Sequence, residues 1–139
     1  AAIACEHGVE GVYVSNHGGR QLDHGRGSIE VLPEVVAAVE GRAAVIVDGG
    51  FLRGTDVVKA MALGADAVGV GRLLGYALGA AGAEGVARML EILESEIRGT
   101  LGMLGVTSWS QLDASYLHPA PPVGPAHATS AFPLLAEDY

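Results

Sequence analysis

Three short apolar segments stand out along the chain. They cover residues 11–15, 44–48 and 67–70, are rich in β-branched residues, and are followed by glycine and polar or charged residues. A run of this kind predicts a buried strand that stops where the glycines begin. The sequence therefore predicts three strands, each apolar along its whole length, as expected when both faces of a sheet are covered.

Apolar residues at helical spacing follow each predicted strand. They mark helices over residues 29–39 and 86–97, and between them a helix from Thr55, its expected cap, to Leu63. Asp56 is placed to favour the positive N-terminus of that middle helix. The threefold order of strand and helix is typical of a parallel α/β fold, in which sites form at the carboxyl ends of the strands.

The end of the first predicted strand brings a base and a cation together. His17 follows the strand by two residues, and a histidine can take a proton from a hydroxyl or a carbon near neutral pH. Arg20 offers a planar fork that fits a carboxylate. Between them, Gly18 and Gly19 allow a turn tight enough for both side chains to face one small ligand. The alternative is a loop histidine beside a solvated arginine.

The other two strand ends combine glycine with arginine. Residues 48–50 (DGG) are followed by Arg53, and the third strand is followed by Gly71 and Arg72. Exposed amides and arginines make a local anion site, and barrel enzymes commonly hold phosphate in successive loops of this kind. Each motif alone is better explained as a turn with a solvated arginine, but the two together favour a phosphate.

The composition of the chain excludes several classes of binding partner and site. Sixteen acidic residues against eight basic ones give the 139-residue chain a formal charge of −8, which argues against a nucleic-acid binder. The single cysteine, Cys5, excludes an intrachain disulfide, and no apolar run is long enough to cross a membrane. The expected protein is soluble and cytoplasmic, and its remaining histidines are too scattered for a metal site.

Residues 15–23 (SNHGGRQLD) closely resemble the signature of the FMN-dependent 2-hydroxy-acid dehydrogenases and oxidases. The resemblance continues through residues 48–50, 53–57 and 63–65 to Gly71-Arg72 at consistent spacing. It implies a (β/α)8 TIM barrel, of which this chain would supply the last three βα units over residues 1–117. Residues 118–139 are rich in proline and are expected to form an extended tail.

The resemblance also implies an activity, the oxidation of an (S)-2-hydroxy acid to a 2-oxo acid, with electrons passing to FMN as hydride or via a carbanion. His17 matches the catalytic base and Arg20 the arginine that holds the substrate carboxylate. The implied cofactor contacts are Ser15, at the flavin ring, and Asp48, Gly49, Gly50, Arg53, Gly71 and Arg72, at the ribityl chain and phosphate.

Two departures from the family pattern qualify this picture. Leu52 stands where a phosphate-binding arginine is expected, which should weaken FMN binding by about 1.5–3 kcal/mol unless a neighbour such as Arg53 compensates. The active-site tyrosines, the flavin-contacting lysine and the acid that orients the histidine belong to N-terminal strands that this sequence does not contain. The expected partners are therefore the N-terminal half of the same barrel, a 2-hydroxy carboxylate and further copies, as a tetramer. The alternative is an inactive half-barrel or an assembly partner.

Overall fold

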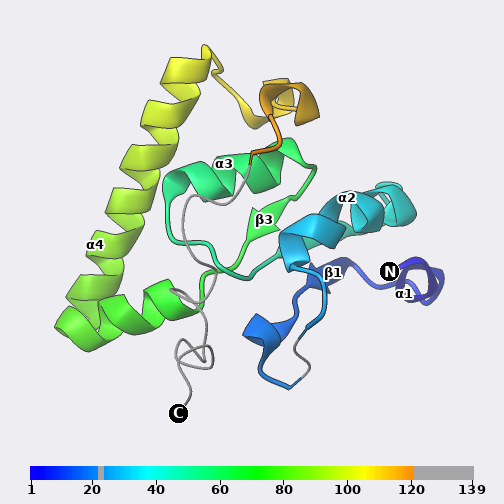
Figure 1. Ribbon diagram of the computed structural model, residues 1–139, viewed down its shortest axis with the longest axis horizontal. Helices are drawn as coiled ribbons and strands as arrows, with labels where there is room; N and C mark the ends of the chain where they lie inside the picture. Colours follow the sequence, from blue (N-terminus) through cyan, green and yellow to red (C-terminus); the bar gives the residue numbers. More distant parts are fainter. Residues whose placement is uncertain (22–23, 121–139) are drawn as a thin grey trace.

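The computed structural model describes residues 1–21 and 24–120, and its centre is a three-stranded parallel sheet (Figure 1). The strands are β1 (Gly11–Val14), β2 (Ala44–Val47) and β3 (Ala67–Val68), in the order β1-β2-β3. In this register Val14 pairs with Val47, and Val47 with Val68. The predicted parallel α/β arrangement is confirmed, although β3 is two residues shorter than the sequence predicts.

Helices connect and follow the strands. The structure contains α1 (Ala2–Glu6), α2 (Ser28–Val39), α3 (Gly54–Ala62) and α4 (Arg72–Leu104), and the 3-10 turns η1 (His17–Gly19), η2 (Trp109–Gln111) and η3 (Ala114–Tyr116). In Figure 1, α2 and α3 lie beside the strands, while α4 forms a bent arm along one side of the molecule. None of the helices in this part of the chain is long and apolar enough to cross a membrane.

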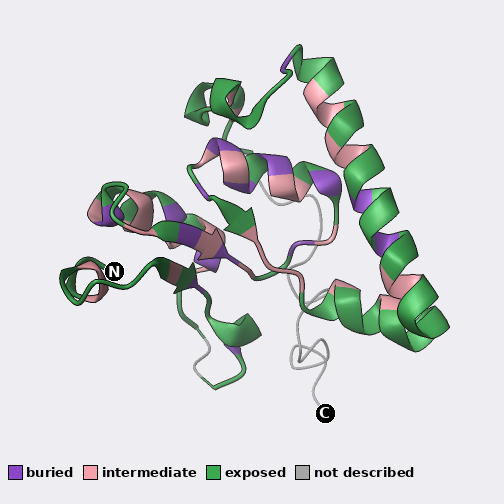
Figure 2. Cartoon of the chain, turned by 180° about the vertical axis from the view of Figure 1, so that it is seen from behind, coloured by how far each residue is buried: buried purple, intermediate pink, exposed green. Residues whose placement is uncertain are grey.

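The core lies on one side of the sheet. Val14, Val45 and Val47 point to that side and are buried against Leu32 and other residues of the helices. The opposite side carries the alternate residues of the strands, of which Tyr13 is 55% exposed. Figure 2 shows buried stretches on α2 and α3, whereas most of α4 is coloured as exposed. The expectation that both faces are covered is therefore wrong for this chain. Within the observed strands both faces carry apolar or aromatic residues, so the pattern does not distinguish an open face from a covered one.

The start of α3 differs from the expected capping. Arg53 is the N-cap residue, so Thr55 lies inside the first turn and is not the cap. Asp56 has the expected role, because its carboxylate accepts hydrogen bonds from the backbone N–H groups of Leu52 and Arg53 at 3.2 and 3.0 Å. Glu96 of α4 accepts a third, from Gly54 N–H, at 2.7 Å. The N-terminus of α3 is thus capped in part by a carboxylate that is distant in sequence, and the local sequence could not predict this contact.

The last helix begins fourteen residues before the segment in which helical spacing first appears. It starts directly after Gly71 and is interrupted at Ala81 and Gly82, whose backbone angles are not helical. Its first segment contains Gly75 and Gly79, which disfavour helix, so the sequence pattern did not predict a helix there. The predicted tail beyond residue 120 lies outside the described residues, and the boundary at residues 117–118 stays a prediction.

Candidate active site

The carboxyl ends of the three strands open into one cavity of about 450 Å³. The loop after β1 contributes His17, Gly18 and Arg20 to its wall. The loop after β2 contributes residues 48–52, and the segment after β3 contributes Gly69, Gly71 and Arg72. Seven of the nine residues expected at the site therefore line one cavity, although they are spread over more than fifty positions of sequence.

His17 occupies a tight turn that fixes its side chain. Its φ is 52°, a left-handed conformation that is uncommon outside glycine. Its backbone N–H donates to Ser15 Oγ at 3.1 Å, and Asn16 Oδ1 accepts from Gly18 N–H at 2.9 Å. The ring Nδ1 lies 2.5 Å from Gln21 Oε1. With Gln21 Oε1 as the acceptor, Nδ1 would carry the hydrogen, and Nε2 would be the ring nitrogen that can act as a base.

Two arginines in the cavity wall lack a carboxylate partner. Within residues 1–21 and 24–120, no ion pair involves Arg20 or Arg72. Arg72 is also the first residue of α4, and no side chain caps that helix. The first backbone N–H groups of a helix point outward without intrahelical partners and favour an anion. Arg72 and the start of α4 therefore form one positively charged region of the cavity wall. Arg20, near His17 in the sequence, forms a second.

Asp48 provides an acceptor in the same cavity wall. Its Oδ1 is buried and has no hydrogen-bond partner among the described residues. A buried carboxylate oxygen without a donor is costly, which favours a ligand that brings a hydroxyl group. The backbone is held in place by Ser28, whose hydroxyl donates to the Asp48 carbonyl oxygen. Gly49 is required next to it, because a Cβ at that position would overlap Ser28 Oγ.

Two expected site residues lie outside the cavity wall. Arg53 turns toward α4, where its guanidinium binds Glu96 Oε1 at 2.7 and 2.8 Å. That pair raises the pKa of Arg53 and lowers the pKa of Glu96. Ser15 contacts the backbone of His17 and shapes the turn. Leu52, in contrast, does line the cavity, so an apolar side chain stands at the position of the expected arginine.

A second cavity of about 570 Å³ lies inside the bend of α4. Its wall is largely apolar, with Tyr76, Met89 and Ile92 among the lining side chains, and it shares only Leu52 with the first cavity. No group of three or more His, Cys, Asp or Glu residues suited to a metal occurs in the described chain. The first cavity is therefore the one that combines a base, cations and an orphaned acceptor.

Comparison with known proteins identifies the family. The model of the family described as FMN-dependent dehydrogenase matches residues 1–119. Over 118 residues the chain is 45% identical to an L-lactate oxidase of Nostoc sp., a match that covers 85% of this chain and 32% of that protein. It is 53% identical over 108 residues to a 4-hydroxymandelate oxidase of Amycolatopsis orientalis, covering 78% and 30%.

Solved structures agree with this result. A mandelate oxidase crystallised with (S)-2-phenylpropionate superposes with a TM-score of 0.76 at 51% identity, over 78% of this chain and 33% of that chain. The chain thus belongs to the FMN-dependent dehydrogenase family, a family of (β/α)8 barrels whose cofactor is FMN. It spans about a third of the length of these relatives. Because two Arabidopsis thaliana relatives are named peroxisomal, the predicted cytoplasmic location is not confirmed.

The residues of the cavity fit FMN. Asp48 Oδ1 is an unpartnered acceptor suited to a hydroxyl of the ribityl chain. Gly50 and Gly71 have open space where a Cβ would stand, so a ligand can approach their backbone. Arg72 and the uncapped start of α4 suit a phosphate.

The sequence did not predict two further residues of the site, Gln21 beside His17 and Gly69 beside Asp48. Only the spacing of four residues from His17 to Gln21 offered a local signal.

Proposed function

We propose that the intact protein containing this chain is an FMN-dependent oxidase or dehydrogenase of (S)-2-hydroxy acids. The observation that carries the proposal is the single cavity in which His17 and Arg20 face Asp48, the paired glycines and Arg72. The names of the relatives, among them L-lactate oxidase and 4-hydroxymandelate oxidase, support the same class of reaction.

Substrate binding is assigned to Arg20. Its guanidinium lines the cavity and has no carboxylate partner within the described residues, so a substrate carboxylate can take up its donors. A bidentate pair would fix the acid and hold its hydroxyl-bearing carbon toward His17, three residues earlier in the chain.

Proton removal is assigned to His17. The hydrogen bond from Nδ1 to Gln21 Oε1 leaves Nε2 free to accept a proton from the substrate. The imidazolium that results can keep its Nδ1 hydrogen bond, so the ring need not turn during the step. Bound FMN would supply the acceptor for the two electrons that leave the substrate carbon.

Cofactor binding is divided between three strand ends. Asp48, Gly49 and Gly50 would contact the ribityl chain, Ser15 the flavin ring, and Gly71 and Arg72 the phosphate. Arg53 can contribute only if its pair with Glu96 opens, because its guanidinium is bound there. We therefore assign the phosphate charge to Arg72 and the start of α4, because Leu52, in the loop after β2, supplies no charge.

The rest of the barrel completes the protein in this proposal. The sheet described here has one neighbour missing at β1 and one at β3, and its Tyr13 side is open. We propose that these three βα units form the last part of a (β/α)8 barrel, that the remaining strands lie against both edges, and that the assembled protein is a homo-oligomer, with four copies as the family-based expectation.

The experiment is purification of the intact protein, identification of the flavin released on denaturation, and turnover assays with lactate, glycolate and mandelate. FMN in equimolar amount and formation of a 2-oxo acid from at least one of these acids are expected. A protein without flavin and without turnover would contradict the proposal, and would favour the alternative of a non-catalytic assembly partner.

A further inference from the structure

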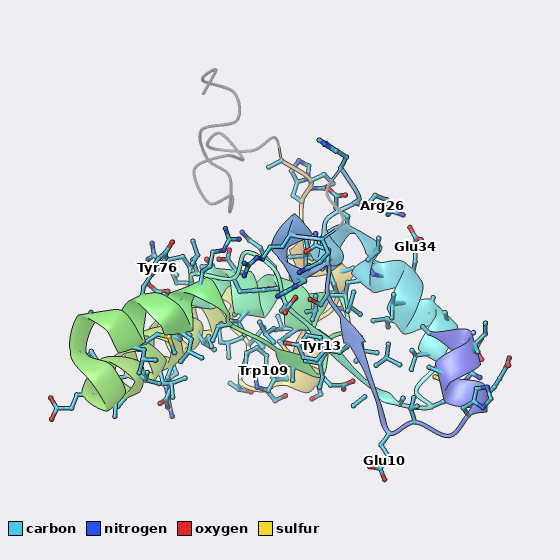
Figure 3. The ribbon with its side chains drawn as sticks, turned by 90° about the horizontal axis from the view of Figure 1, so that it is seen from below. Glu10, Tyr13, Arg26, Glu34, Tyr76 and Trp109 are labelled. Atoms are coloured by element: carbon cyan, nitrogen blue, oxygen red, sulfur yellow. The ribbon has the colours of Figure 1, made fainter. Side chains whose placement is uncertain are left out.

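Tyr13 lies on the open side of the sheet, in line with the cavity. It is paired in register with Ile46, which in turn is paired with Ala67. Since side chains alternate along a strand, Tyr13, Ile46 and Asp48 all point to the side opposite the core. Figure 3 shows Tyr13 near the centre of the molecule, beside the strands. Its aromatic ring therefore shares a face with the carboxylate that we assign to the ribityl chain.

The hydroxyl of Tyr13 reaches across β2 to the end of β3. A Cβ placed on Gly69 would overlap the Tyr13 hydroxyl oxygen and would stand 3.2 Å from Asp48 Cβ. Gly69 itself lines the cavity. The missing side chain at Gly69 thus leaves the space that the phenol group fills, and it brings that group next to Asp48.

The phenol and the carboxylate interact. The ring of Tyr13 is exposed, but its hydroxyl end lies between Gly69 and Asp48, and burial there raises the pKa of the phenol. The charge of Asp48 and a hydrogen bond to its carboxylate raise that pKa further. The Tyr13 hydroxyl is thus placed to donate to the Asp48 carboxylate, whose Oδ1 has no hydrogen-bond partner among the described residues.

We propose that Tyr13 is a positioning residue, whose phenol hydroxyl holds the Asp48 carboxylate so that Oδ1 faces a hydroxyl group of the flavin's polyol chain. The proposal rests on the proposed function, because it concerns the same cofactor site. It assigns a role to a residue outside the family signature at positions 15–23, and it links that role to the absence of a side chain at Gly69.

The test compares three flavins in the intact protein and its Tyr13→Phe variant. FMN and riboflavin both contain the polyol chain, whereas lumiflavin carries a methyl group in its place. Loss of the phenol hydroxyl should weaken FMN and riboflavin by the same factor, roughly 10- to 100-fold for one hydrogen bond to a charged group. Lumiflavin affinity should not change. Dissociation constants come from quenching of flavin fluorescence, and no turnover is needed.

Matched variants separate positioning from a general structural effect. Tyr116→Phe removes a hydroxyl from an exposed tyrosine of η3 and should leave all three affinities unchanged. In an Asp48→Ala background, which removes the acceptor, Tyr13→Phe should have little further effect on riboflavin, because both changes break one contact. Gly69→Ala, which displaces the phenol, should reproduce the pattern of Tyr13→Phe while keeping the hydroxyl.

Two results would overturn the inference and differ from failure of the proposed function. Equal weakening of all three flavins by Tyr13→Phe would mean a structural role, and unchanged riboflavin affinity would mean no role. In both cases the unmodified protein still binds flavin, so the proposed function stands. If the unmodified protein binds none of the three, the proposed function fails and the inference fails with it.

Discussion

The two sides of the sheet differ in nearly every physical property. On the helix side, Val47 and the α2 residues Leu32 and Val39 are almost completely excluded from solvent. On the other side, Tyr13 is largely exposed and Asp48 carries an oxygen without a hydrogen-bond partner among the described residues. The side chains on the helix side are buried in an apolar core, whereas the open side carries a carboxylate oxygen and arginines that lack partners within the described residues.

This difference indicates where stability and function arise. Burial of apolar side chains is the main source of folding free energy, and it is concentrated on the helix side. Unsatisfied polar groups reduce stability and are retained where a ligand satisfies them. Variants on the open side should therefore change binding or turnover with little change in stability, and variants on the helix side should do the reverse.

The largest effect is expected for His17→Ala in the intact protein. Loss of the base should lower kcat by about 10²–10⁴-fold, with FMN content and the urea midpoint unchanged. His17→Asn tests the turn separately, because asparagine tolerates the left-handed backbone of this position. Substitution of the exposed His7 is the control. Turnover of either His17 variant at the unmodified rate would contradict the assignment.

On the helix side, Leu32→Ala should lower the free energy of unfolding by about 2–5 kcal/mol, because it leaves a cavity beneath the sheet. Fluorescence during urea unfolding measures the change. Leu90→Ala, on an exposed face of α4, removes the same atoms and should change stability far less. If the Leu32 variant lost FMN affinity while keeping its urea midpoint, the separation of the two sides would be wrong.

Arg72→Ala distinguishes the parts of the cofactor. Loss of a charge-assisted contact should weaken FMN by about 1.5–3 kcal/mol, or roughly 10–100-fold, while riboflavin, which lacks the phosphate, keeps its affinity. Arg98→Ala, at an exposed arginine paired with Glu94, is the control. Equal losses for both flavins would place Arg72 elsewhere than at the phosphate.

The smallest effect concerns the pair that holds Arg53. Its hydrogen bond with Arg53 is the main reason that the pKa of Glu96 lies below 4.5. A lowered carboxyl pKa stabilises the fold above the ordinary pKa, and this contribution disappears as the pH falls through the lowered value. Glu96→Ala should therefore cost about 1 kcal/mol at pH 7, mostly as a lost helix cap, and progressively less in acid.

Urea unfolding at several pH values measures this difference. A cost that grew as the pH fell would have the wrong sign for a carboxylate of lowered pKa. FMN affinity is expected to stay unchanged in Glu96→Ala, whereas a clear gain would mean that a released Arg53 reaches the phosphate, contrary to its assignment to Arg72.

Local sequence signals were sufficient for much of the fold and for the strand ends. The strands follow from short apolar runs, and α2 and α3 follow from helical periodicity. Parallel strands place their carboxyl ends together, which explains why His17, Asp48 and Arg72 meet in one cavity. Features that depend on distant contacts were not predictable. Arg53 and Glu96 are 43 residues apart in the sequence, and no local pattern predicts that they form an ion pair.

The open face of the sheet also depends on contacts between residues that are distant in sequence, and it was not predicted. Tyr13 lies in an apolar run that suits a strand covered on both sides, and its relation to Gly69 depends on two strand pairings. The early start of α4 was likewise not predictable, because its glycine-containing first segment lacks the helical spacing of apolar residues that marks the second.

The most direct test of the central claim is anaerobic mixing of the intact protein with an (S)-2-hydroxy acid, followed through the visible absorbance of the bound flavin. The account predicts rapid loss of that absorbance with one 2-oxo acid formed per flavin, and a much slower loss in His17→Ala despite full FMN content. Absence of bound flavin, or equal rates in the two proteins, would contradict it.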